Sequence, residues 1–344
     1  MKKLTIFLLI VSTISFAQKP PIKFGKVDIE DLKMETYPSD TSAYAVVLCD
    51  YGVFNSTDFN FTRTLRIKIL KKEGLYLADQ TFRNDESTTL RGKTFNLENG
   101  EIVESKLKQE SIYKERITRD RYLYKVAMPN VKVGSVIDIE YSHFLIPDVW
   151  YFQRNIPVLW SELRLEQSPN IDFRKNYTGY QSLLISESNR WVARNMPAFK
   201  EEAYTNSVEN YISKFSFDIH SVTFPNYYRA FTTSWDAVGK MLMNDEYFGY
   251  LLTGNLFLNN AAENIRKSGL PDEEKIKQAC EFVKSVKWNE RERLYGSYST
   301  LGAAYDKHIG NSADINIMLI SLLNKIDIPA YPVIMSSRSN GLLP

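Results

Sequence analysis

Residues 62–70 alternate between apolar and charged side chains, which predicts a β-strand with one buried face. Three apolar residues fall on one side and two basic residues on the other (Leu65, Ile67 and Ile69; Arg66 and Lys68). The Lys72-Glu73-Gly74 sequence then predicts a turn that ends the strand. The same alternation recurs at 136–141, 163–165 and 215–219. Short strands at this spacing predict a sandwich or a bent sheet in the first part of the chain.

Two places in this part predict β-hairpins. Asn99-Gly100 separates residues 94–97 from residues 102–103, and Asn and Gly tolerate the positive φ angles of a two-residue hairpin turn. Residues 131–134, which end in Gly134, lead into the alternating run 136–141 and suggest a second hairpin.

From about Phe231 the pattern becomes helical. Ser234 can cap a helix whose apolar residues recur at helical spacing (Trp235, Val238, Met241 and Leu242). A second helix is predicted to begin at Pro271, because three acidic residues follow it and favour the positive end of the helix dipole. Its apolar stripe consists of Ile276, Ala279, Cys280 and Val283. We therefore expect Cys280 on the buried face, where a thiol is insulated from chemistry.

The segment 307–335 predicts a loop, a helix, a break and a strand, in that order. Gly310 allows a tight turn, and Ser312 is a good N-cap for the helix that follows. An apolar stripe continues this helix (Ile315, Met318, Leu319, Leu322 and Leu323). Ile328-Pro329-Ala330 breaks the helix, and residues 331–335 read as a strand.

Composition limits the classes of function. The 344 residues are enough for about two domains, and the 44% hydrophobic and 24% charged content is ordinary for a globular protein. Phosphate binding needs clustered Lys and Arg, whereas here 43 basic residues are balanced by 41 acidic ones to a formal net charge of +2. We therefore do not expect a nucleic acid partner. The two cysteines, Cys49 and Cys280, are interpreted as buried apolar residues. The three histidines share no metal-binding motif, and we expect neither a metal site nor a cofactor.

The first 17 residues read as a secretory signal peptide. Lys2 and Lys3 precede a short apolar run, and Ala17 ends a small-residue cleavage site before Gln18. The run is shorter than the roughly 20 residues that a spanning helix needs, and no later stretch is long enough either. We expect an exported mature chain without a membrane span.

Five large aromatic residues of the first part allow two interpretations (Trp150, Tyr151, Phe152, Trp160 and Trp191). They could form a platform for stacking carbohydrate, or they could fill a core between two sheets. Core filling is the favoured interpretation, and alternation alone does not separate the two.

Three segments resemble the domain of unknown function 3857: residues 63–70 with Gly74, residues 128–137 and residues 150–158. The resemblance extends over residues 22–225. It implies a β-rich module that stands in front of a transglutaminase-like domain in exported bacterial proteins. The expected location is therefore the periplasm or the cell surface of a bacterium.

Residues 307–335 resemble the core of transglutaminase-like, papain-related domains, with Gly310, Asp314 and Pro329 matching the pattern. In that family the position of Ser312 holds the catalytic cysteine, whose thiolate a histidine and the helix dipole stabilise. The resemblance places the histidine and an orienting aspartate on later strands, beyond Pro344, so we expect residues 231–344 to be an incomplete domain of a longer chain. His308 reads as an exposed loop residue.

These observations predict an α+β protein: an antiparallel, β-sandwich-like domain followed by the helical start of a transglutaminase-like domain. Serine at the nucleophile position favours a non-catalytic role, binding an envelope peptide or glycan or serving as a structural element. The alternatives are a peptidase-like or amidase-like hydrolase that uses Ser312 with a downstream histidine, and a protein whose β-rich module performs the function alone.

Overall fold

The computed structural model describes residues 19–84, 88–116, 122–144, 146–166, 168, 170–231 and 234–342. The predicted signal peptide, residues 1–17, lies outside the described residues. The chain divides into two compact units. The sheet unit comprises the described residues up to Ser168 with Tyr177–Lys200 and Ile212–Ser216. The helical unit comprises residues 170–176, Glu201–Tyr211 and the described residues from Phe217 onward.

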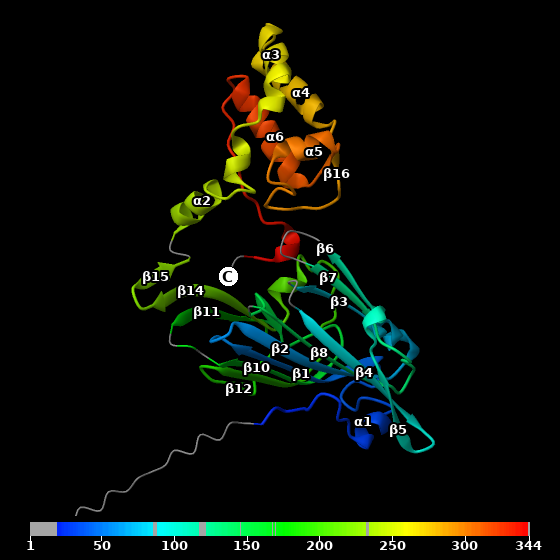
Figure 1. Ribbon diagram of the computed structural model, residues 1–344. Helices are drawn as coiled ribbons and strands as arrows, with labels where there is room; N and C mark the ends of the chain where they lie inside the picture. Colours follow the sequence, from blue (N-terminus) through cyan, green and yellow to red (C-terminus); the bar gives the residue numbers. More distant parts are fainter. Residues whose placement is uncertain are drawn as a thin grey trace, which may run out of the picture. The chain divides into compact units, whose positions relative to one another are not determined.

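An eight-stranded sheet forms the centre of the sheet unit (Figure 1). Its order is β12-β13-β10-β1-β2-β8-β4-β5. These strands are β1 (Ala45–Asn55), β2 (Asn60–Ile69), β4 (Thr89–Glu98), β5 (Glu101–Lys106), β8 (Val136–Phe144), β10 (Val158–Glu166), β12 (Ile185–Ser186) and β13 (Arg190–Met196). With helices concentrated in the later part of the chain, the α+β class is confirmed. β1 and β10 pair in parallel within an otherwise antiparallel sheet, which the sequence did not predict.

The Asn99-Gly100 hairpin is confirmed. Both residues have positive φ, 52° and 83°, and join β4 to β5 with Glu98 opposite Glu101. The second predicted hairpin is wrong, although residues 136–141 do lie in strand β8. The preceding strand, β7 (Tyr122–Ala127), belongs to a separate three-stranded sheet, β3-β7-β6, because it pairs with β3 (Asp79–Asn84) and β6 (Ile112–Arg116).

Both faces of β2 are buried, contrary to the half-buried strand predicted from its alternation. Arg66 and Lys68 are only 4% and 0% exposed, because residues 23–34, here called the N-terminal strap, cover them. Arg66 forms a bidentate pair with Asp138 and donates to the Lys26 carbonyl at 2.6 Å. The Lys68 amine donates to the carbonyls of Leu32 and Gly134 at 2.6 and 2.7 Å. The strap, with helix α1 (Ile29–Lys33), is thus held by buried cations that bind backbone oxygens.

Aromatic side chains fill the other side of this sheet. Trp150, Phe152 and Trp191 are at most 3% exposed, and Trp191 lies 4.8 Å from Phe215 between ring centroids. Gly52 makes room for this packing, because a Cβ at this position would lie 2.6 Å from Trp150. Core filling is therefore confirmed for these three residues, while Tyr151 and Trp160 are only partly buried.

A further sheet contains β11 (Ile171–Thr178), β14 (Lys214–Phe224) and β15 (Tyr227–Ala230). The short strand β9 (Val149–Tyr151) also pairs with β14, through residues 214–216. The predicted alternation at 215–219 lies within β14.

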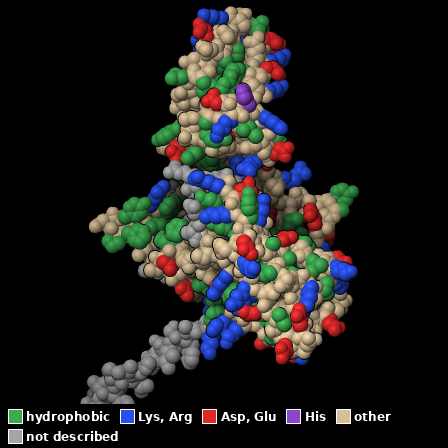
Figure 2. Space-filling model, turned by 45° about the vertical axis from the view of Figure 1, so that its right-hand side comes forward, with side chains coloured by type: hydrophobic (Ala, Val, Ile, Leu, Met, Phe, Trp, Pro, Cys, Tyr) green, Lys and Arg blue, Asp and Glu red, His purple; other side chains and the backbone are tan. Residues whose placement is uncertain are grey.

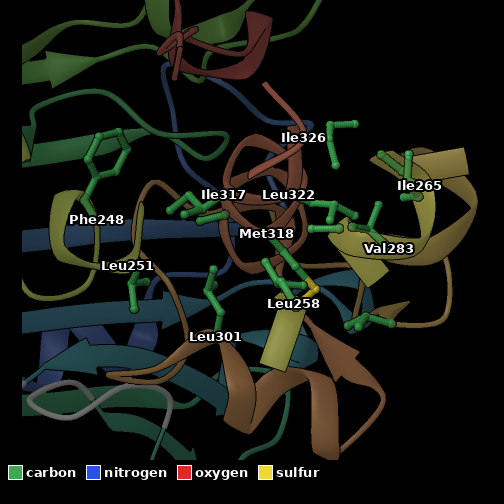
Figure 3. Packing of buried hydrophobic residues seen from close by; sticks show 14 of the residues in the cluster. Phe248, Leu251, Leu258, Ile265, Val283, Leu301, Ile317, Met318, Leu322 and Ile326 are labelled. Carbon is green, nitrogen blue, oxygen red and sulfur yellow. The ribbon is translucent and has the colours of Figure 1, made fainter. Parts of the chain in front are cut away.

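The helical unit is built around helix α6 (Ser312–Lys325), against which helices α3 (Asn259–Lys267), α4 (Asp272–Val283) and α5 (Leu301–Asp306) pack (Figure 1). The shared core includes Leu258, Val283, Leu301, Met318 and Leu322 (Figure 3). The unit also contains α2 (Trp235–Met243) and the short helices η3 (Val208–Asn210), η4 (Gly249–Leu252), η5 (Leu256–Leu258) and η6 (Arg338–Asn340). The predicted helices at 235 and 271 are confirmed: Ser234 caps α2, and Pro271 precedes α4.

Residues 331–335 form no strand, which corrects the prediction. They have no regular secondary structure, and Tyr331, Val333 and Met335 are at least 80% exposed. A strand needs a hydrogen-bonded neighbour, and none of the described strands pairs with this segment.

Candidate functional site

The N-terminus of helix α6 is where the sequence placed the candidate chemistry, with Gly310, Ser312 and Asp314. A two-stranded parallel pair leads into it: β16 (Lys287–Trp288) and β17 (Ile309–Gly310), with Trp288 opposite Gly310. The buried face of the helix carries Ile317, Met318 and Leu322, which pack in the core of the helical unit. Its first turn contacts the loop that follows β16 through the Ser312 N–H, which donates to the Arg291 carbonyl.

Asn311, not Ser312, is the N-cap of this helix. The Asn311 side chain accepts a hydrogen bond from the backbone N–H of Asp314 at 2.9 Å, and the Asp314 carboxylate accepts one from the backbone N–H of Asn311 at 2.9 Å. This reciprocal pair is a capping box. The predicted cap was displaced by one residue because Asn caps as well as Ser and stands directly before it.

Asp314 is fully buried and has a structural role. Its second carboxylate oxygen accepts a hydrogen bond from the backbone N–H of Ser297 at 2.9 Å. Gly310 gives this side chain space, since a Cβ at position 310 would lie 2.9 Å from the Asp314 Cβ. Two of the three residues that match the transglutaminase-like pattern, Gly310 and Asp314, are thus explained by the packing of the helix start.

The Ser312 hydroxyl is held by the backbone of Arg293. It accepts a hydrogen bond from the Arg293 N–H at 2.8 Å and lies 3.1 Å from the Arg293 carbonyl, to which it donates. Its single proton therefore points to a carbonyl oxygen. The Ser312 N–H donates to the Arg291 carbonyl at 3.1 Å.

Residues 289–300, here called the covering loop, account for most polar groups at the helix start. Besides the contacts of Ser312, the Asn311 side-chain amide donates to the Tyr295 carbonyl at 2.9 Å, and the Asn289 N–H donates to the Gly310 carbonyl at 2.9 Å. An anion or an acyl group that bound to Ser312 would compete with these hydrogen bonds.

No histidine hydrogen-bonds to Ser312 within the described residues. His308 is exposed, as predicted, with a positive φ of 50°. Its carbonyl accepts from the Lys287 N–H at 3.0 Å, and its ring lies 6.1 Å from that of Tyr305. His308 is therefore part of the turn before β17, not a base beside the serine.

The two cysteines differ from each other in burial. Cys49 is buried in strand β1, where burial raises the pKa of its thiol far above its ordinary value. Cys280 is only partly buried in helix α4, where Ala279 and Val283 are the buried residues, so the prediction of a buried thiol at this position is corrected. Both thiols are free. In the part of the chain that the structure describes, no group of three or more His, Cys, Asp or Glu could hold a metal ion. No helix of that part is long and apolar enough to cross a membrane.

Sequence reasoning missed the covering loop. Its sequence carries one signal that could have indicated it: Gly296, where a Cβ would lie 2.6 Å from a Leu251 methyl and 3.0 Å from an Asp314 carboxylate oxygen. The partners of Gly296 come from segments distant in sequence, so the glycine alone could not reveal what it fits against.

The comparisons with known proteins support the first part of the interpretation. Residues 56–200 match the model of DUF3857, a domain of unknown function. This match lies within the boundaries predicted for the β-rich domain, 22–225. The boundaries of this domain and the transglutaminase-like domain expected at 231–344 stay predictions, since the matched residues end at 200.

Among solved structures, the chain is similar to a Parabacteroides distasonis protein described as a "putative protease", with a TM-score of 0.59 and 13% identity. The match covers 83% of this chain and 59% of that protein, so the chain spans less than two thirds of its length. At this identity the likeness shows the fold alone. A match to yeast leukotriene A4 hydrolase, at a TM-score of 0.24 and 10% identity over 87% of this chain and 48% of that one, carries no argument. No curated protein matches the chain.

Proposed function

We propose that this chain is a non-catalytic binding or structural protein of the bacterial cell envelope, exported by its signal peptide. In this proposal the C-terminal unit is a transglutaminase-like domain that has lost its nucleophile. The observation that carries the proposal is the hydrogen bonding of Ser312, whose hydroxyl proton is directed to the Arg293 carbonyl. A serine nucleophile needs a base that accepts this proton and an open path to the acyl carbon.

An acyl-transfer hydrolase that uses Ser312 with a histidine beyond Pro344 is the second candidate. The description of the Parabacteroides neighbour as a protease favours it, as does the place of Ser312 in the first turn of a helix. It would require the covering loop to open and the hydroxyl to leave both of its backbone partners. Each such hydrogen bond contributes about 1 kcal/mol net, so the free energy of substrate binding would have to offset the loss of both.

The deciding experiment compares the full-length protein with its Ser312→Ala variant. Both are incubated with a fluorophosphonate probe and with fluorogenic peptide amides. We expect no labelling at position 312 and equal background turnover. Specific labelling of Ser312, together with loss of turnover in Ser312→Ala only, would establish the hydrolase instead.

The same variant tests the structural role of the hydroxyl. Ser312→Ala removes two hydrogen bonds to the covering loop, so we expect a loss of about 1–2 kcal/mol in the free energy of unfolding. Hydrogen exchange at the Arg293 amide should accelerate. Ser285→Ala is the matched control, because Ser285 is exposed just after helix α4 and lies outside this network.

The binding role is tested by sedimentation with isolated peptidoglycan, which presents both glycan strands and peptides. We expect wild type and Ser312→Ala to pellet alike if the chain binds an envelope ligand. A chain that stays in the supernatant would favour a purely structural role.

A further inference from the structure

The hairpin formed by β14 and β15 carries several aromatic side chains that are exposed to solvent. Phe224, Tyr227, Tyr228 and Phe231 are 42%, 49%, 68% and 39% exposed. Figure 2 shows hydrophobic side chains along its left-hand edge, where this hairpin lies. These rings are separate from the buried aromatics of the sheet unit, which the sequence had offered as a stacking platform.

The register of the hairpin places rings on both of its faces. Phe224 pairs with Tyr227 across a two-residue turn, Pro225-Asn226, with Asn226 at a φ of 65°. Tyr228 pairs with Thr223 and, by the alternation of a strand, points to the opposite face. A flat protein surface or a sugar ring would cover one face only. A medium that surrounds the tip would cover both.

The charge of the segment indicates the kind of medium. From Ile219 to Trp235 the sequence contains no Asp or Glu, and Arg229 is its one Lys or Arg. The Arg229 guanidinium lies 4.9 Å from the centre of the Phe231 ring. Tyrosine and other aromatic rings favour the headgroup level of a bilayer, and a basic side chain there can pair with lipid phosphate. No carboxylate of the segment would repel anionic headgroups.

We propose that the tip of the β14–β15 hairpin inserts peripherally into the headgroup region of an anionic lipid membrane. The rings of Phe224, Tyr227 and Tyr228 enter the interface, and Arg229 pairs with phosphate groups. The hairpin keeps its own hydrogen bonds in this position, since Phe224–Tyr227 and Thr223–Tyr228 remain paired. The proposal is independent of the chemistry at Ser312.

The test is co-sedimentation of the purified protein with vesicles of phosphatidylglycerol and phosphatidylethanolamine. We expect wild type to pellet with them. The double variant Tyr227→Ser/Tyr228→Ser should bind at least 10-fold more weakly. Arg229→Gln should weaken binding several-fold on anionic vesicles and leave the weaker binding to neutral phosphatidylcholine vesicles unchanged.

The matched control is Tyr204→Ser/Tyr331→Ser. It removes two tyrosines of the same helical unit that are 103% and 80% exposed, and it should bind as wild type does. Thermal unfolding of every variant is recorded, so that a loss of binding is distinguished from a loss of folding. Because all of these side chains are exposed, we expect melting temperatures equal to that of wild type.

A second measurement does not depend on removing residues. Tyr228→Trp places a fluorophore at the tip, and lipids brominated near the headgroup should quench it when vesicles are added. The proposal is overturned if wild type stays in the supernatant with every vesicle composition, if the two double variants bind equally, or if Trp at 228 is not quenched. Failure would leave a protein partner as the occupant of this surface and would not affect the test of Ser312.

Discussion

The Ser312 hydroxyl binds both the N–H and the C=O of a single residue, Arg293, which lies 19 positions earlier in the chain. This two-way contact requires a group that donates and accepts at ordinary hydrogen-bond distance. A hydroxyl satisfies it, whereas a thiol is a weak donor with a larger atom. Serine is therefore the residue that pins the covering loop to helix α6, and its identity has a structural explanation.

Asp314 should be essential for the stability of the same helix start. Both of its oxygens accept backbone N–H groups in a site without solvent exposure. Asp314→Asn would place an NH2 group against one of these donors, so we expect a loss of about 2–3 kcal/mol in the free energy of unfolding of the helical unit. Urea denaturation measures the loss, and hydrogen exchange at the Ser297 and Asn311 amides locates it.

Asp306→Asn is the control for this prediction. Asp306 is exposed at the end of helix α5, and its replacement should change stability by no more than about 0.5 kcal/mol. Equal effects of the two substitutions would show that the buried hydrogen bonds of Asp314 contribute nothing.

Two glycines of the helical unit should respond to alanine in opposite directions. At Gly249 a Cβ would lie 2.0 Å from the carbonyl oxygen of Met243, so Gly249→Ala forces the backbone apart and should cost about 3 kcal/mol. At Gly239, inside helix α2, a Cβ meets nothing within 4 Å. Gly239→Ala should stabilise the unit by about 0.5–1 kcal/mol, since glycine is a poor helix former. Thermal unfolding of both variants checks the pair, and a shift of the same sign in both would contradict it.

The buried amine of Lys68 should make the stability of the sheet unit depend on pH. Burial lowers the pKa of Lys68 to about 8 in the folded protein. An unfolded lysine keeps a pKa of about 10.4, so between these values the unfolded chain binds more protons. Stability should therefore rise with pH across this window, by roughly 1–3 kcal/mol relative to a variant without the amine.

Lys68→Met provides that reference. Urea denaturation of both proteins at pH 7.5 and pH 9.5 isolates the contribution of Lys68, because the other titrating groups are shared. At pH 7.5 the variant also leaves the Leu32 and Gly134 carbonyls without this partner, and limited proteolysis should then cut the N-terminal strap faster. Parallel pH dependence in the two proteins would show that Lys68 titrates as an ordinary lysine.

At the candidate site, the sequence pattern predicted the features that depend on neighbouring residues and missed those that depend on distant ones. Gly310 and the helix from about position 312 were found from the sequence, because a turn residue and an apolar stripe are both read from neighbours in the chain. Asp314 was singled out by the family resemblance, and its capping role is seen only in the structure. The N-cap was predicted at Ser312 and is Asn311, a difference of one residue between two neighbours that both favour this position. The covering loop was missed, since its partners are Ser312 and Asp314 in helix α6, and side-chain periodicity carries no information on contacts between separate segments.

The elements that depend on local preference were predictable from the amino-acid pattern: the strand around Ile67, the Asn99-Gly100 hairpin, and the helices that begin after Ser234 and Pro271. Which faces are covered depends on contacts between segments that are distant in the chain. Arg66 and Lys68 alternate with apolar residues as solvent-facing side chains do, yet the N-terminal strap buries them, and each donates a hydrogen bond to a backbone carbonyl of that strap. The parallel pairing of β1 with β10 joins Val47 to Val158, and residues 331–335 lack a pairing strand among those described. Side-chain alternation follows from the backbone geometry of a strand, whereas burial and strand pairing depend on which distant segment of the chain packs against that strand.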